Sequence, residues 1–135
     1  MKKLIQADFQ ERRDILAGEM GLRSIAIIAT SPVAMRNRDA DYKFRSDSSF
    51  FYLTGFAEPE AVAVIETFDT EEEGYSYSLF CRERDREMEI WNGYRAGVDG
   101  AVDDYDADEA YAIDLLDEEI LEKLQNKDKL FYRIG

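Results

Sequence analysis

Histidine is absent from the 135 residues of this chain. A nucleophile–histidine–acid triad is therefore impossible within it, and so is any metal site that relies on imidazole. Chemistry carried by this chain alone would have to use carboxylates, tyrosine, lysine or the single thiol of Cys81. A lone cysteine also cannot form an internal disulfide, so nothing in the sequence requires an oxidising compartment.

Long apolar runs are missing as well. Met1-Lys2-Lys3 is followed by polar residues within a few positions, and no stretch approaches the length that crosses a bilayer. The sequence therefore predicts neither a signal peptide nor a transmembrane anchor of the usual kind, and we expect a cytoplasmic location.

Positive charge is scarce, because 17 basic residues face 30 acidic ones and leave a net charge of −13. A field of that sign repels phosphate backbones and anionic lipids, which argues against nucleic acid and membrane surfaces as partners. Solubility is a sufficient explanation for the charge.

The hydrophobic pattern predicts one α/β domain, residues 1–135, built as a mixed β-sheet flanked by helices. Strands are predicted at 24–29, 61–68, 75–81 and 129–133, and the second and third of them form a hairpin around an acidic turn at 69–74. Helices are predicted at 8–20, 49–53, 84–91 and 117–125. The segment 37–49 is expected to be a loop, and the acidic segment 98–111 to mix helix and loop.

Two of these helices have predicted caps and core faces. Asp8 is expected to cap the first, and Asp117 the last. The core face of the first helix is predicted to contain Phe9, Leu16 and Met20, flanked by Arg12 and Arg13. The core face of the last is predicted to contain Ile120, Leu121 and Leu124.

The acidic segment invites a calcium interpretation that fails on inspection. Asp104, Asp106 and Asp108 match the first three ligand positions of an EF-hand loop. However, Glu109 replaces the turn glycine, and Leu115 stands where the bidentate glutamate must be. A solvated acidic surface is the better interpretation.

Three further residues are candidates for a functional role. Cys81 lies in an alternating apolar strand and is interpreted as an inert core thiol. Arg45 and Trp91 each combine a large planar group with an irregular backbone, as recognition residues often do. Their structural alternatives stay open: an arginine that ties a loop through backbone carbonyls, and a tryptophan that closes the edge of the core. The glycines at 93, 97 and 100 do not form a phosphate loop and are interpreted as helix ends and turns.

Two longer blocks carry a family resemblance. Residues 42–61, YKFRSDSSFFYLTGFAEPEA, resemble the signature of the aminopeptidase P N-terminal domain. Residues 82–97, RERDREMEIWNGYRAG, are similar to that family's Arg-Asp … Glu-x-Trp-x-Gly-x-Arg-x-Gly region. Gly100-Ala101, Tyr105 and Asp108 continue the order, and the opening 9–13 also fits, so the resemblance runs from about residue 8 to the end.

The resemblance implies an α/β domain of ribonuclease H-like topology, as in the N-terminal domains of the creatinase/prolidase family. In that family a pita-bread catalytic domain follows, holds two divalent metal ions, usually manganese, and removes the N-terminal residue from peptides with proline in second position. This sequence ends before such a domain, so the resemblance places no catalytic residue, metal ligand or cofactor in it. Because the chain stops directly after a predicted strand, we expect the domain to be truncated near its C-terminus.

The resemblance also implies roles for individual residues. In tetrameric family members the N-terminal domain of one subunit closes over a neighbour's active site, and the positions that line this pocket correspond to Trp91 and Asp39. An indole would restrict a narrow cleft to short peptides, and a carboxylate would attract the free amine. Tyr42, Arg45 and Arg95, from the same blocks, are expected to be structural or interface residues. The expected partners are the catalytic domain, identical subunits in a dimer or tetramer, and proline-containing peptides.

The sequence therefore leaves two main functions. The first is the oligomerisation and gating domain of a manganese-dependent Xaa-Pro aminopeptidase, a metallopeptidase, with no catalysis by this chain alone. The second is a stand-alone peptide- or protein-binding module without protease activity. A carboxylate-dependent hydrolase is not favoured, because coincidental carboxylate pairs are expected among 30 acidic residues.

Overall fold

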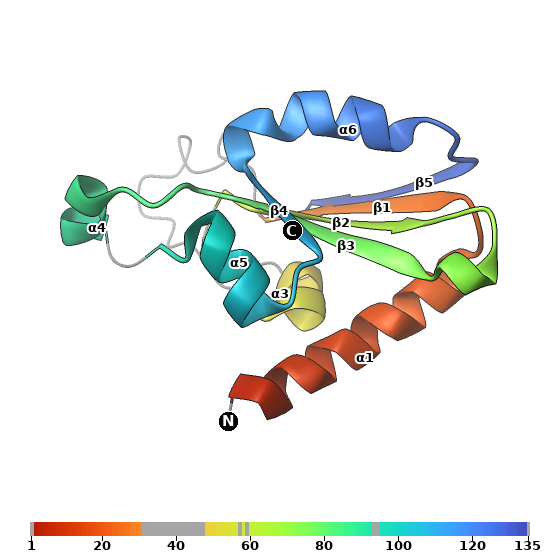
Figure 1. The fold of residues 1–135 in the computed structure, drawn as a ribbon, viewed down its shortest axis with the longest axis horizontal. Coiled ribbons are helices and arrows are strands. Elements are labelled where there is room, and N and C mark those ends of the chain that lie inside the picture. Colours follow the sequence, from red (N-terminus) through yellow and green to blue (C-terminus); the bar gives the residue numbers. More distant parts are fainter. Residues whose placement is uncertain (1, 31–47, 57, 59, 93–94, 135) are drawn as a thin grey trace.

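The computed structural model (Figure 1) describes residues 2–30, 48–56, 58, 60–92 and 95–134. They form a five-stranded mixed sheet with helices on both faces, so the predicted α/β architecture is confirmed. The strands are β1 (Ser24–Ala29), β2 (Val62–Thr67), β3 (Tyr75–Cys81), β4 (Glu109–Ala112) and β5 (Lys129–Ile134). The helices are α1 (Lys2–Met20), α3 (Ser48–Thr54), α4 (Arg86–Asn92), α5 (Gly97–Tyr105) and α6 (Leu116–Leu124), with 3-10 turns η1 (Glu71–Glu73) and η2 (Ile113–Leu115).

The strands lie in the order β4-β3-β2-β1-β5. β2 runs antiparallel to both of its neighbours, while β4 is parallel to β3 and β5 is parallel to β1. The predicted hairpin is confirmed as β2–β3, with Val62 opposite Phe80 and Thr67 opposite Tyr75. Because helices cover both faces of the central strands, β1 and β2 are buried almost throughout and are mostly apolar, with Ser24, Glu66 and Thr67 as their polar residues.

Alternate strand residues point to opposite faces and build two cores. The larger core lies between the sheet and α1, α3 and α5, and the smaller one lies under α6 (Figure 1). Strand residues of the larger core are Ala26, Ile28, Ala63, Ile65, Tyr77, Leu79 and Cys81. Those of the smaller core are Ile25, Ile27, Val62, Val64 and Phe80. Burial raises the pKa of the Cys81 thiol to about 11, which confirms its interpretation as an inert core residue.

Arg13 joins the elements of the larger core. Although it carries a charge, only 1% of its surface is exposed. Its Nη1 donates to the carbonyl oxygen of Leu53 in α3 at 2.8 Å, and its guanidinium carbon lies 4.3 Å from the ring centre of Tyr77 on β3. Its Nη2 is 3.5 Å from a carboxylate oxygen of Asp106, the residue that ends α5. The prediction that Arg13 flanks the core is therefore wrong, because this guanidinium finds its partners inside it.

Charge also holds α6 on the opposite face. Glu66 on β2 is 7% exposed, and its carboxylate accepts a hydrogen bond from Lys123 at 3.0 Å and pairs with Lys127 at 3.4 Å. Ile120 and Leu124 of α6 pack against the smaller core as predicted. Leu121 was expected to face inward as well, but it is 68% exposed, because it lies on the outer side of the helix.

Strand β5 forms an edge of the sheet and exposes apolar side chains on both of its faces. Leu130 pairs with Ile25 and Phe131 with Ala26, so the two side chains point in opposite directions. Leu130 is 54% exposed and Phe131 is 43% exposed.

Several boundaries differ from prediction. Helix α1 begins at Lys2, so Asp8 lies inside it and does not cap it. Helix α6 begins at Leu116 after a 3-10 turn, so Asp117 lies in its first turn and not at its cap. The segment 98–111, predicted as helix and loop, contains all of α5 except Gly97 and all of β4 except Ala112. Gly100 was interpreted as a helix end or turn, but it lies inside α5. Strand β4 has no local signal because it is short and is defined by its pairing with β3.

Replacing Arg13 with methionine should lower the free energy of unfolding by about 1–3 kcal/mol, because the buried carbonyl of Leu53 loses its donor. Arg12→Met is the matched control, since the Arg12 guanidinium bonds an exposed carbonyl, and it should cost less than about 1 kcal/mol. Urea unfolding followed by circular dichroism measures both. Equal losses for the two variants would contradict the central position given to Arg13.

Candidate functional site

Helix α4 lies apart from both layers, beyond the end of β3 (Figure 1). It presents a group of apolar side chains to solvent: Met88 is 41% exposed, Ile90 79% and Trp91 84%. The alternative that Trp91 closes the edge of the core is therefore wrong. Neighbouring exposed apolar residues on one short helix are typical of an interaction site, so α4 is the candidate functional site.

The N-terminus of α4 is capped by a side chain. The Oδ1 of Asp85 accepts hydrogen bonds from the backbone N–H groups of Glu87 at 3.1 Å and Met88 at 3.2 Å. Because Asp85 acts as the cap, the helix starts at Arg86 and not at Arg84 as predicted. This bonding fixes the direction in which the short helix leaves the sheet.

Glu89 fastens α4 to the chain on both of its sides. Arg84 donates to the carboxylate through Nε at 3.3 Å and Nη2 at 3.0 Å. The backbone N–H groups of Asp85 and Arg95 donate to it at 3.0 and 3.2 Å. The hydrogen bond from Arg84, followed by that from the Arg95 backbone, holds the pKa of Glu89 below its usual range.

Glu58 provides a second attachment next to the first. Its Oε2 accepts a hydrogen bond from the backbone N–H of Ala96 at 2.8 Å, and its Oε1 lies 3.4 Å from the guanidinium of Arg82. The chain that returns from α4 is thus held against the chain that leaves β3. Arg95 adds a bond from Nη1 to the carbonyl oxygen of Glu83 at 3.2 Å. We call Glu58 and Glu89, with their arginine and backbone partners, the α4 anchor.

Gly97 is required where the anchor meets α5. Its φ is +72°, and a Cβ at this position would lie 2.5 Å from Cγ of Arg84. Any side chain would therefore strain the backbone and displace the arginine that bonds Glu89. The Glu-x-Trp-x-Gly-x-Arg-x-Gly pattern thus has a physical basis at Glu89, Trp91, Arg95 and Gly97.

Trp91 and Arg95 are predictable from the sequence as candidates, whereas the two anchor carboxylates are not. Glu58 and Glu89 both lie inside the blocks that carry the family resemblance, which is the one signal that marks them. Among 30 acidic residues, neither stands out by residue type. Arg95 has a structural contact in the anchor, and its role at an interface stays a prediction.

Other sequence-derived candidates have different outcomes. Asp39, Tyr42 and Arg45 lie outside the described residues, so their roles stay predictions. The carboxylate of Asp108 accepts a hydrogen bond from the backbone N–H of Tyr77 at 2.8 Å and so links the segment before β4 to β3. Within the described ranges, no group of three or more His, Cys, Asp or Glu side chains is arranged to hold a metal ion. None of the helices in that part of the chain is long and apolar enough to cross a bilayer.

Comparisons with known proteins confirm the resemblance seen in residues 42–61 and 82–97. A family model described as "Aminopeptidase P, N-terminal domain" matches residues 9–132. The Xaa-Pro aminopeptidase of Escherichia coli is 36% identical over 136 residues, which span 100% of this chain and 30% of that protein. Human Xaa-Pro aminopeptidase 3 is 32% identical over 98 residues, which span 72% of this chain and 19% of that protein.

Solved structures agree with these sequence matches. The structure of Pseudomonas aeruginosa aminopeptidase PepP matches 94% of this chain and 28% of its own, with a TM-score of 0.81 and 42% identity. Zinc-substituted E. coli aminopeptidase P in complex with product matches 93% of this chain and 28% of its own, with a TM-score of 0.82 and 36% identity. The chain therefore spans less than a third of the length of these relatives.

Acidification should loosen α4 through Glu89. Because the folded-state pKa of Glu89 is lowered, its carboxylate stabilises the anchor above its ordinary pKa, and this contribution is lost as the pH falls through the folded-state value. Trp91 is the single tryptophan, so its fluorescence anisotropy reports on α4. The anisotropy should fall in acid before the circular dichroism of the sheet changes.

Two glutamine variants test whether Glu89 is responsible. Glu89→Gln should show low anisotropy at neutral pH and no further acid step, whereas Glu87→Gln, on the same helix but outside the anchor, should follow the unmodified protein. An acid step that persists unchanged in Glu89→Gln would show that the carboxylate does not hold α4.

Proposed function

The chain belongs to the aminopeptidase P N-terminal domain family, and on that premise we propose that it is the non-catalytic oligomerisation and gating domain of an Xaa-Pro aminopeptidase. In this role, α4 of one subunit closes over the active site of a neighbouring subunit, where peptides with proline in second position are cleaved. The observation that carries the proposal is the 84% exposure of Trp91 on a firmly anchored helix.

The anchor supports a binding role for α4. The exposed side chain of Trp91 adds little to the stability of the fold, because it buries little surface. The α4 anchor nevertheless holds the backbone on both sides of α4 in place. Preorganisation of this kind lowers the entropy lost when a surface binds its partner. An exposed indole supplies both apolar contact and a polar N–H, which suits a pocket that is partly wet.

The proposed mechanism assigns Trp91 a positioning function. At the mouth of a neighbour's active site, its ring narrows the opening, packs on the apolar part of a short peptide and excludes water. Asp39 is proposed to attract the free amine of the same peptide, since a carboxylate favours a nearby ammonium group. The reacting bond is left to residues of the catalytic domain.

The metal ions of the parent enzyme are proposed to lie outside this chain. The resemblance implies two divalent ions, manganese in most relatives, held by the catalytic domain. The described residues offer no ligand group for such a centre, so they do not fit it, and the role given to this chain uses no metal. Its proposed partners are that catalytic domain and identical subunits in the cytoplasm.

Replacing Trp91 with alanine in the full-length enzyme should lower kcat/KM for an Xaa-Pro peptide about tenfold, equivalent to about 1.4 kcal/mol of transition-state stabilisation. Metal content should not change, because Trp91 is not proposed to be a metal ligand. Trp91→Phe should restore part of the loss, since it keeps an aromatic ring.

A matched control separates gating from a general surface effect. Val102→Ala removes a side chain that is 41% exposed on α5, outside the candidate site, and should leave kcat/KM unchanged. Wild-type kinetics for Trp91→Ala would disprove the role given to Trp91.

A further inference from the structure

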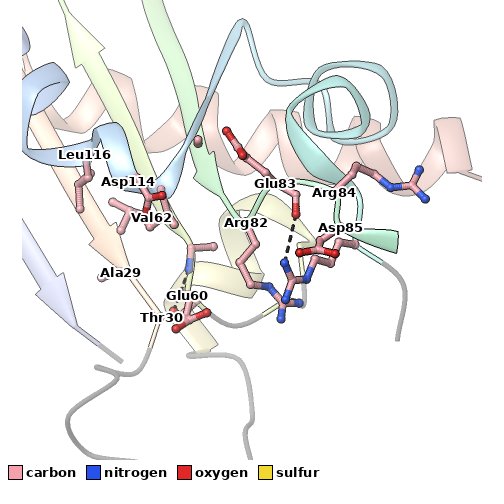
Figure 2. A pocket seen from close by; sticks show the side chains of 14 residues that line it. Ala29, Thr30, Glu60, Val62, Arg82, Glu83, Arg84, Asp85, Asp114 and Leu116 are labelled. Atoms are coloured by element: carbon pink, nitrogen blue, oxygen red, sulfur yellow. Dashed lines mark hydrogen bonds between the residues drawn. The ribbon is translucent and has the colours of Figure 1, made fainter. Parts of the chain in front are cut away.

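A cleft lies where β1, β3 and β4 end and β2 begins (Figure 2). Its volume is about 620 Å³, within the range of small-molecule sites. Ala29, Val62, Ile113 and Leu116 give it an apolar floor. Ligands of open α/β sheets commonly bind beyond the carboxyl ends of the strands, and three of the four strands here present that end.

One wall of the cleft carries the guanidinium groups of Arg82, Arg84 and Arg95 beside the carboxylates of Glu83 and Asp85, and Arg82 and Arg84 are ion-paired with Glu58 and Glu89. Arg95 bonds through Nη1 to the carbonyl oxygen of Glu83, an uncharged acceptor, and its buried Nε has no partner within the described part of the chain. The buried Nε of Arg82 is likewise unpartnered there, and the Arg82 ion pair with Glu58 is long at 3.4 Å. A buried polar atom without a partner is costly, so these atoms favour a ligand that accepts hydrogen bonds.

The other wall carries carboxylates. Asp114 comes from the turn after β4 and lies beside Val62 and Leu116, across the cleft from Arg82 in Figure 2. Its side chain makes no hydrogen bond or ion pair with any of the residues that the structure describes. Glu60 lines the cleft next to Thr30, at the edge between the two walls (Figure 2).

We propose that this cleft binds a short zwitterionic peptide or amino acid. The ligand carboxylate bonds Arg95 and Arg82, the ammonium group bonds Asp114 with help from Glu60, and apolar side chains lie on the floor. A phosphate ester or another plain anion fits less well, because Asp114 and the net charge of −13 would repel it. A ligand with only a positive charge would be repelled by the guanidinium group of Arg95. Only a ligand with both signs of charge satisfies both walls.

This site shares Arg82 and Arg95 with the α4 anchor, but the exposed apolar residues of α4 do not line it. Trp91 does not line the cleft, and the ligand proposed here needs no neighbouring subunit. Trp91→Ala should therefore leave ligand binding unchanged, so failure of one proposal can be told apart from failure of the other.

The test uses the 135-residue chain labelled with ¹⁵N and titrated with three forms of one dipeptide. Ala-Pro carries both charges, N-acetyl-Ala-Pro lacks the ammonium group, and Ala-Pro amide lacks the carboxylate. Ala-Pro should give saturable shifts of the amide signals of Thr30, Val62, Arg95 and Asp114. Each blocked form should bind at least about tenfold more weakly, because it loses one charge-assisted contact.

A variant that breaks no contact in the structure makes the test specific. Asp114→Asn should weaken Ala-Pro about tenfold but leave N-acetyl-Ala-Pro unchanged, because the blocked peptide has already lost the group that Asp114 binds. Asp117→Asn, exposed on α6 and outside the cleft, should bind all three peptides as the unmodified chain does. Arg95→Gln should weaken Ala-Pro but not Ala-Pro amide.

Several outcomes would overturn the proposal. Absence of saturable shifts with Ala-Pro would exclude a peptide site in the cleft. Equal binding of all three dipeptides would show that charge is not recognised. Full affinity of N-acetyl-Ala-Pro, unaffected by Asp114→Asn, would make the cleft a simple anion site.

Discussion

The fold depends on how this chain accommodates one buried guanidinium. Arg13 is 1% exposed, and a charge at that depth is costly unless it is paired and hydrogen-bonded. Its Nη1 and Nη2 have partners, whereas its buried Nε has none in the described part of the chain. Its partners come from α3, β3 and the end of α5, so the positions of these elements are coupled to that of α1. On the opposite face of the sheet the buried charge is negative. The carboxylate of Glu66 pairs with Lys123 on α6 and with Lys127 shortly after the end of that helix. Both layers are therefore fixed to the sheet by a buried charge in addition to apolar contact.

That coupling extends to the candidate site. Helix α5 is held by Asp106 at its end and begins at Gly97, directly after the residues that bond Glu58 and Glu89. The chain between β3 and α5 is therefore attached to a firm body at both ends, and α4 projects from it. This arrangement explains how a helix of seven residues, with few contacts of its own, keeps Met88, Ile90 and Trp91 directed to solvent.

The sequence predicts those parts whose signal is local. Strands β1 and β3 follow directly from buried or alternating apolar runs, and the hairpin follows from the acidic turn between its strands. Strand β4 is not predictable in this way, because it exists through pairing with a distant segment. Asp8 and Asp117 mislead as caps because a chain this rich in acidic residues offers cap-like residues at many positions. The burial of Arg13 and the exposure of Trp91 contradict what their residue types suggest, since both depend on partners far away in the sequence. The motif blocks at 42–61 and 82–97 predict the family. The α4 anchor and the cleft are formed by contacts between segments that lie apart in the sequence, so the sequence alone does not predict them.

Within the described residues β5 is an edge strand of the sheet, and this has a consequence for the colloidal behaviour of the 135-residue chain. An edge strand with apolar side chains on both faces is a template for pairing with another copy. The net charge of −13 opposes such pairing, because two molecules of this chain repel one another before they come into contact. That repulsion reaches only about 8 Å at physiological ionic strength and shortens further as salt is added. Added salt, which at moderate concentration keeps many proteins in solution, would here weaken the repulsion that keeps the β5 edges of two molecules apart.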